Sequence, residues 1–176
     1  HACAKGAVDA TPCEPGTKSP DGVACVGCVA GEYQPAAAQS SCEACREGSY
    51  CLERSSVQVA CAPGSFAAAS GLGACVGCDA GEFQSSSSAT ACDACDAGGW
   101  CGAGASAVTA CNEGTHRNST GGASADDCAV CEPGHACAKG AVDATPCEPG
   151  TKSPDGVACV GCVAGEYQPA AAQSSC

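Results

Sequence analysis

No stretch of this chain has the apolar stripe of an amphipathic helix, in which large side chains return every 3.6 residues. Its apolar residues are mostly alanine, valine and cysteine, scattered among glycine, serine and acidic residues. No apolar run approaches the roughly 20 residues of a membrane-spanning helix. The pattern predicts small disulfide-rich modules in a tandem repeat rod of short β-ribbons and turns, with almost no helix.

A tetrapeptide, Cys-x-x-Gly, punctuates this pattern, and ten of its thirteen copies in the chain form one regular series. The glycines of this series are Gly16, Gly31, Gly48, Gly64, Gly81, Gly98, Gly114, Gly134, Gly150 and Gly165. Proline precedes the glycine in several copies, as at Pro15, Pro63, Pro133 and Pro149. Proline at the second position and glycine at the third are typical of a type II turn, which we therefore expect at these tetrapeptides.

All six aromatic residues lie two positions after one of these glycines. They are Tyr33, Tyr50, Phe66, Phe83, Trp100 and Tyr167. We expect each ring to lie against the disulfide of its own module, as a miniature core. The alternative interpretation is an aromatic stripe that binds a ligand.

The 21 cysteines follow a fixed spacing, in which gaps of two, five and nine residues do not vary and one gap stretches from 11 to 16 residues. Cysteine above about 8–10% is typical of a disulfide scaffold. The chain has no Met and only two leucines, so packing alone offsets little of its conformational entropy. A disulfide that closes a 15-residue loop contributes about 3 kcal/mol. Because such frameworks persist in oxidising compartments, we expect an extracellular or cell-surface (secreted) protein.

Two repeats are nested in the chain. Residues 1–42 recur letter for letter at 135–176, which is a period of 134, and the cysteines from Cys28 to Cys61 reappear fifty positions later. The pattern predicts modules with boundaries at 1–27, 28–77, 78–130, 131–161 and 162–176, the first and last incomplete. Repeats of this kind contact mainly their neighbours, so we expect an elongated rod. Because His1 falls inside a module, we expect this chain to be a segment of a longer protein.

The segment from Cys25 to Cys45, CVGCVAGEYQPAAAQSSCEAC, resembles the ephrin-receptor-like cysteine-rich repeat. It is also similar to single-loop modules of tumour-necrosis-factor-receptor-type ectodomains and, more loosely, to EGF-like modules. The segment CREGSYCLERSSVQVACAPGSF resembles tandem repeats of algal and protist surface proteins, including the flagellar hairs called mastigonemes. Modules of these families serve as stalks, adhesins, receptors and filament subunits, so the resemblance indicates a module type rather than one function.

We expect a non-enzymatic structural component of an extracellular filament or fibrous cell-surface appendage, in the form of a disulfide-stapled glycoprotein rod. Its partners would be other copies of itself or neighbouring modules. The alternative is the ectodomain stalk of a receptor or adhesin that binds a protein ligand. The letter-for-letter repeat favours the filament, because a binding face normally differs between modules. The net charge of -12 argues against a nucleic-acid partner.

The cysteine spacing permits two disulfide schemes. Cys61 and Cys75 share a frame with Cys78 and Cys92, so we expect both pairs to close single loops. The same frame extends to Cys28–Cys42, Cys111–Cys128, Cys147–Cys159 and Cys162–Cys176, which leaves Cys45–Cys51, Cys95–Cys101 and Cys131–Cys137 as short rings. Cys3 then has no partner in the chain. A crossed scheme, as in tumour-necrosis-factor-receptor modules, pairs Cys45 with Cys61 and leaves out Cys13.

The sequence gives weaker signals for metal binding and catalysis. Cys25, Cys28, Cys42 and Cys45 have nearly zinc-ribbon spacing, but the whole grid of cysteines favours disulfides, so we expect no metal and no cofactor. No catalytic motif is present. We expect His116 to be an exposed loop residue. Asp126-Asp127 and Asp155-Gly156 lack the spacing of a calcium loop and are expected to serve turns and solvation.

Asn118-Ser119-Thr120 is a sequon in the longest elastic loop, between Cys111 and Cys128, and it predicts N-glycosylation of Asn118 in a secreted protein. Ser85–Ser88 with Thr90, and the Ser-Pro pairs at Pro20 and Pro154, are further candidate sites for sugars.

Overall fold

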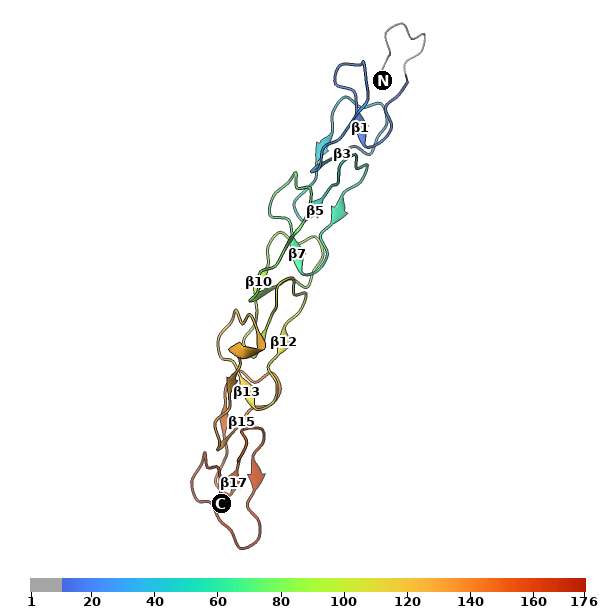
Figure 1. Ribbon diagram of the computed structural model, residues 1–176. Helices are drawn as coiled ribbons and strands as arrows, with labels where there is room; N and C mark the ends of the chain where they lie inside the picture. The colour runs from blue at the N-terminus through green and yellow to red at the C-terminus, as the bar shows by residue number, and fades with distance from the viewer. Residues whose placement is uncertain (1–10) are drawn as a thin grey trace. The chain divides into compact units, whose positions relative to one another are not determined.

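Nine antiparallel hairpins, each built from two strands of two residues, form the regular structure of this computed structural model, which describes residues 11–176 (Figure 1). The pairs are β1 (Thr17–Lys18) with β2 (Val26–Gly27), β3 (Glu32–Tyr33) with β4 (Glu43–Ala44), β5 (Ser49–Tyr50) with β6 (Val59–Ala60), β7 (Ser65–Phe66) with β8 (Val76–Gly77), β9 (Glu82–Phe83) with β10 (Asp93–Ala94), β11 (Gly99–Trp100) with β12 (Thr109–Ala110), β13 (Thr115–His116) with β14 (Ala129–Val130), β15 (His135–Ala136) with β16 (Thr145–Pro146), and β17 (Thr151–Lys152) with β18 (Val160–Gly161). A single 3-10 turn, η1 (Ala125–Asp127), is the one helical element of the described residues. The predicted fold class, small disulfide-rich modules with almost no helix, is confirmed.

Each hairpin begins at a Cys-x-x-Gly tetrapeptide, whose cysteine and glycine we call the leading cysteine and the turn glycine. The turn glycines have φ between 74° and 93°, the left-handed region that a type II turn requires at its third position. In the first hairpin the Thr17 N–H donates to the Glu14 carbonyl at 3.1 Å, and the Cys28 N–H donates to the Gly16 carbonyl at 2.9 Å. The predicted turn is therefore present, and it sets the first strand at the two residues after the glycine.

The interior of the hairpins is formed mainly by two positions. One is the leading cysteine, and the other is the residue three positions after the turn glycine, which we call the inner position. Every buried apolar residue of the described chain occupies one of the two: Cys13, Cys28, Cys45, Cys51, Cys61, Ala67, Cys78, Cys95, Cys101, Cys111, Cys131, Cys137 and Cys147. Three of the four buried polar residues, Ser19, Gln34 and Ser153, are also at the inner position, and the fourth, Thr17, directly follows a turn glycine. The core is thus made of half-cystines and small or amide side chains.

The described chain divides into two compact units. One comprises the residues up to Cys78 together with Gln84–Cys92, and the other comprises Asp79–Phe83 and Asp93–Cys176. Within the first unit the hairpins labelled β1, β3, β5 and β7 follow one another in chain order, and within the second so do those labelled β12, β13, β15 and β17 (Figure 1).

Successive hairpins within a unit are joined by backbone hydrogen bonds. The N–H of a turn glycine donates to the inner carbonyl of the next hairpin, as from Gly31 to Cys51 at 2.8 Å and from Gly114 to Cys137 at 2.8 Å. In return, a loop N–H of the next hairpin donates to the leading-cysteine carbonyl, as from Arg54 to Cys28 at 2.7 Å. Most of these loop donors have positive φ, and four of them are not glycine: Ala38, Arg54, Ser88 and Ala172.

The hairpin after next also makes contact. A Cβ added to Gly31 would collide with the Gly71 carbonyl oxygen, and one added to Gly81 would lie 2.9 Å from the Gly121 carbonyl oxygen. The backbone of a hairpin is thus bonded to its neighbour, as expected for repeats that contact mainly their neighbours, and at these glycines it is also pressed against the second hairpin along.

Candidate functional site

Ten disulfides are present in the described residues, and they follow the sequential scheme. The pairs are Cys13–Cys25, Cys28–Cys42, Cys45–Cys51, Cys61–Cys75, Cys78–Cys92, Cys95–Cys101, Cys111–Cys128, Cys131–Cys137, Cys147–Cys159 and Cys162–Cys176. Cys45 and Cys61, which the crossed scheme pairs with each other, are in different disulfides. Cys3, which the sequential scheme leaves without a partner, lies outside the described residues.

The disulfides fall into two geometric classes, both of which start at a leading cysteine. In the short rings the partner is at the inner position, so both half-cystines of Cys45–Cys51 are 0% exposed. In the long rings the partner stands just before the second strand, outside the core. Cys13 is 1% exposed while its partner Cys25 is an exposed residue. A reductant in solvent therefore has easier access to the long rings.

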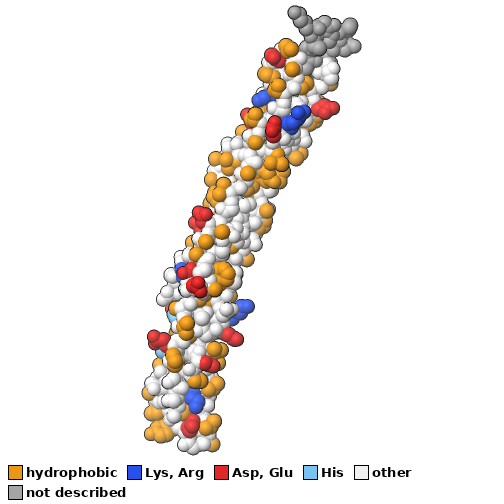
Figure 2. Space-filling model, in the orientation of Figure 1, with side chains coloured by type: hydrophobic (Ala, Val, Ile, Leu, Met, Phe, Trp, Pro, Cys, Tyr) orange, Lys and Arg blue, Asp and Glu red, His pale blue; other side chains and the backbone are white. Residues whose placement is uncertain are grey.

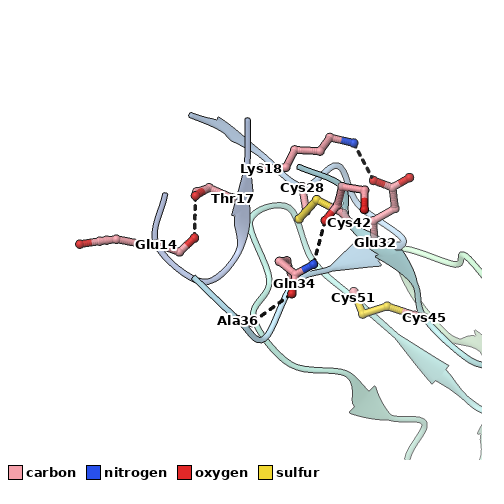
Figure 3. Close-up of a disulfide and its surroundings, with 11 residues drawn as sticks. Glu14, Thr17, Lys18, Cys28, Glu32, Gln34, Ala36, Cys42, Cys45 and Cys51 are labelled. Atoms are coloured by element: carbon pink, nitrogen blue, oxygen red, sulfur yellow. Dashed lines mark hydrogen bonds and ion pairs between the residues drawn. A yellow bond between two sulfur atoms is a disulfide. The ribbon is translucent and has the colours of Figure 1, made fainter. Parts of the chain in front are cut away.

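Where the inner residue is glutamine, its side chain orders the loop of a long ring. Gln34 donates from Nε2 to the Ser41 carbonyl at 2.7 Å and accepts at Oε1 from the Ala36 N–H at 3.0 Å (Figure 3). Gln84 and Gln168 repeat both bonds in their own loops. The short Cys45–Cys51 ring lies next to this loop in Figure 3, with its own cysteine at the inner position. Glutamine and cysteine thus occupy the same structural position in different hairpins.

The aromatic rings are not the core. None of them is buried among the described residues: Tyr33, Tyr50, Phe66, Phe83 and Trp100 are half-buried, and Tyr167 is 79% exposed. Each of the first five ends the first strand of a hairpin, opposite a residue of the second strand. Whether each ring lies on the disulfide of its own module stays a prediction.

His116 was predicted to be an exposed loop residue, and that prediction was wrong. It is half-buried in strand β13, paired with Ala129, and its Nδ1 lies 3.3 Å from the Val142 carbonyl oxygen. The reason is the hairpin frame, because His116 lies two residues after Gly114, where other hairpins have a tyrosine or phenylalanine. The signal that could have located His116 is its place two residues after the glycine of a Cys-x-x-Gly tetrapeptide, which is a strand position whatever residue occupies it.

The cysteines with zinc-ribbon spacing, Cys25, Cys28, Cys42 and Cys45, are divided among three disulfides. Because zinc binds the thiolate, cysteines in disulfides are not ligands for it. Within residues 11–176 no group of three or more His, Cys, Asp or Glu side chains has the arrangement of a metal site.

The aspartates considered for calcium serve turns. The Asp127 carboxylate accepts from the N–H groups of Ala123 and Ser124 at 2.7 Å and 3.0 Å, and Asp155 accepts from the Val157 N–H at 3.1 Å. The two N–H donors, with a further contribution from the charge of Arg117, hold the pKa of Asp127 below its ordinary value of 3.8. In the described structure these carboxylates serve as acceptors for backbone N–H groups.

Asn118 is exposed, as are Ser119 and Thr120 after it. The three residues follow strand β13 in an irregular stretch of the Cys111–Cys128 ring, between His116 and η1. The neighbouring Arg117 holds this stretch by donating to the Thr120 and Asp127 carbonyls, both at 3.1 Å. The sequon is therefore accessible, while the segment around it is ordered by the ring.

The face shown in Figure 2 has no large patch of one charge, because acidic and basic side chains are scattered among apolar and uncharged ones. Two ion pairs bridge successive hairpins, Lys18 with Glu32 at 3.4 Å and Lys152 with Glu166 at 3.6 Å (Figure 3 shows the first). No helix in the described part of the chain is long and apolar enough to cross a membrane.

These features define the protein as a tandem array of small disulfide-bonded hairpins, a class typical of oxidising compartments. No family model matches the chain, and no curated protein matches it. The resemblance to ephrin-receptor-like, EGF-like and mastigoneme repeats stays a prediction.

Proposed function

We propose that this protein is a non-enzymatic structural component of an extracellular filament or fibrous cell-surface appendage. Its partners are other copies of the same array or neighbouring modules. In this role the chain contributes length, stiffness and chemical resistance, rather than a binding pocket.

The observation that carries the proposal is that one segment of sequence makes the same contacts at two places in the chain. In 13–42 and again in 147–176, a threonine hydroxyl caps the turn (Thr17 and Thr151), a lysine pairs with a glutamate of the next hairpin, and a glutamine orders the loop. A sequence that repeats its contacts with a period of 134 residues supports an array that continues by the same rule. Within a unit, backbone hydrogen bonds join each hairpin to the next one, which supports an array that grows by adding one hairpin after another.

The disulfides support the extracellular location, because ten bridges would not survive a reducing cytosol. The net charge of -12 keeps such arrays from adhering to one another without a specific contact. Both properties suit a protein that is exposed to solvent and proteases outside the cell.

The protein is a glycoprotein in this proposal, with a glycan on Asn118. The bond forms between the side-chain nitrogen of Asn118 and the sugar of a lipid-linked oligosaccharide, and the lipid pyrophosphate leaves. Mass spectrometry of protein from its native source should find Asn118 occupied. In secreted expression, Asn118→Gln should remove the glycan mass, whereas Asn112→Gln, at the chain's other asparagine, should leave it. An unmodified Asn118 in native protein would contradict the proposal.

Electron microscopy of native surface material, with gold-labelled antibodies raised against this chain, tests the proposed role. Label repeated along regular fibrils is the expected result. Label on single stalks that end at the cell surface would contradict the filament and favour the receptor or adhesin ectodomain. The same images measure length, since an array of extended modules is far longer than a globule of 176 residues, whose radius of gyration is about 16 Å.

A further inference from the structure

A surface hollow recurs at the joint between two successive hairpins. In the first unit it is lined by Tyr50, Val59, Ala60, Ala62, Ser65, Ala74 and Cys75. In the second unit the lining is His116, Ala129, Val130, Glu132, His135 and Ala144. The two sets occupy the same positions of the frame: the residue two after a turn glycine, the facing second strand, and the start of the next hairpin. We call them the tyrosine joint and the histidine joint.

The pair of positions that face each other across a joint is known from the ion pairs. One is the residue two after a turn glycine, and the other is the residue one after the next turn glycine. Lys18 and Glu32 occupy this pair at 3.4 Å, and Lys152 and Glu166 occupy it at 3.6 Å. In the tyrosine joint the pair is Tyr50 and Ser65, which carry no charge. In the histidine joint it is His116 and His135.

From this comparison we propose that the histidine joint is an acid-sensitive contact between the hairpins β13–β14 and β15–β16. With neutral imidazoles the joint is uncharged, like its tyrosine counterpart. In acid, histidine side chains take up protons. Two positive charges then occupy positions at which the same fold elsewhere holds a lysine and a glutamate.

The surroundings of the two rings strengthen this effect. His135 Nδ1 is buried without a hydrogen-bond partner in the described structure, so a proton bound there lacks an acceptor. His116 Nδ1 lies 3.3 Å from the Val142 carbonyl oxygen, which accepts from the neutral ring as well as from the charged one. Glu132 is the only other titratable group that lines the hollow. Its carboxylate attracts the charged rings and therefore reduces the destabilisation of the joint in acid.

The backbone hydrogen bond across the joint breaks when the two hairpins separate, so the exchange protection of its amide measures how often the joint opens. The Gly114 N–H donates to the Cys137 carbonyl at 2.8 Å, and the matching bond of the tyrosine joint runs from the Gly48 N–H to the Ala67 carbonyl at 2.9 Å. Residue-resolved amide exchange by NMR, at about pH 7.5 and about pH 5 and corrected for intrinsic exchange, compares the two amides in one molecule. We expect the protection of Gly114 to fall about threefold to tenfold more than that of Gly48 in acid.

Three variants separate charge repulsion from general loosening. His116→Tyr with His135→Ser gives the histidine joint the residues of the tyrosine joint and should abolish the difference between the two amides. His116→Lys with His135→Glu installs the ion pair of the other joints and should also abolish it. Glu132→Ala gives the histidine joint the alanine that Ala62 provides in the tyrosine joint, and it should enlarge the acid effect. Thiol titration of each variant checks that its disulfides have formed.

Equal protection changes at Gly114 and Gly48 in the unmodified protein would overturn the proposal. So would an acid effect that persists in the Tyr and Ser variant, because it would then arise from other groups. The proposal does not depend on the filament role, since it concerns one joint within a single chain.

Discussion

At the scale of the residue, glycine and aspartate have defined structural tasks. The turn glycines adopt positive φ, which side chains with a Cβ adopt at a cost of about 1–2 kcal/mol. Aspartates accept backbone N–H groups in the loops, as Asp127 does for Ala123 and Ser124. These tasks explain why a chain with so few large apolar residues still has ordered loops.

Asp127 gives a prediction about acid. Its pKa is lowered by the Ala123 and Ser124 N–H groups, so the folded loop prefers the carboxylate. A lowered pKa stabilises the loop at all pH values above the ordinary 3.8, and the stabilisation is lost as pH falls through the lowered value. An NMR titration from about pH 6 to about pH 2 should therefore move the Ala123 and Ser124 amide signals late, below the ordinary carboxyl range.

Asp127→Asn is the control, because the amide oxygen keeps an acceptor but does not titrate. The two amide signals should then lose their pH-dependent shift. Signals that move at the ordinary carboxyl pKa in the unmodified protein would contradict the assigned hydrogen bonds.

At the scale of the element, the hairpin is a frame built on two main interior positions and bonded to the next hairpin. The leading cysteine and the inner residue fill most of its interior, and several turn glycines, Gly31 and Gly48 among them, lie against the backbone of the second hairpin along. At these positions glycine is required for two separate reasons, its φ and its lack of a Cβ. Two glycines of the chain allow the two effects to be measured apart.

Gly31 and Gly104 both have positive φ, 92° and 71°. A Cβ on Gly31 collides with the Gly71 carbonyl, whereas one on Gly104, in a loop inside the described chain, meets nothing within 4 Å. Gly104→Ala should cost about 1–2 kcal/mol, the cost of positive φ alone. Gly31→Ala should cost more than about 3 kcal/mol, because the facing backbone must also move.

Denaturant unfolding with the disulfides intact measures both variants, and amide exchange locates the damage. For Gly31→Ala, the Gly31 bond to the Cys51 carbonyl should weaken first. Equal destabilisation by the two substitutions would show that the second hairpin does not press on the glycine.

Much of this element was predictable from the sequence, since Cys-x-x-Gly with proline before glycine gives the turn and the first strand. The inner position was not, because it holds serine, glutamine, cysteine, alanine and arginine in different hairpins and so lacks a recognisable apolar pattern. The loop donors were not predictable either, because Ala38, Arg54 and Ser88 have positive φ without being glycine, and the loop that carries them varies in length. The hydrogen bond from each of these N–H groups to the leading-cysteine carbonyl of the preceding hairpin imposes that conformation. His116 was wrongly predicted to lie in a loop for a related reason. The position two residues after a turn glycine was recognised only where it holds tyrosine, phenylalanine or tryptophan.

The single hairpin, from one leading cysteine to the next, is the structural unit. A stretch with successive gaps of five, nine and 11 to 16 residues, such as Cys45 to Cys75, therefore contains a short-ring hairpin followed by a long-ring one. The coarser module boundaries predicted from the period stay a prediction.

At the scale of the whole molecule, cross-links take the place of a hydrophobic core. Half-cystines make up all but one of the buried apolar residues of the described chain. Stability should therefore resist heat and collapse on complete reduction, with loss of the hairpin signal in circular dichroism. A reduced protein that keeps its fold would contradict this.

Limited reduction should proceed in an order set by exposure. Cys25 and Cys159 are exposed half-cystines of long rings, so Cys13–Cys25 and Cys147–Cys159 should open first under a low concentration of reductant. Cys45–Cys51 and Cys95–Cys101 are 0% exposed at both ends and should open last. Alkylation and mass spectrometry record the order, and the control in denaturant should show it erased. Early labelling of a short ring in native protein would contradict the burial of these cysteines.

The central claim is that sequential disulfides close one hairpin after another, and disulfide mapping of the native, non-reduced protein tests it most directly. Proteolysis between the cysteines followed by mass spectrometry should find Cys45 linked to Cys51 and Cys61 linked to Cys75, with no free thiol from Cys13 to Cys176. A peptide that links Cys45 to Cys61 would establish the crossed scheme and contradict the hairpin frame on which the whole account depends.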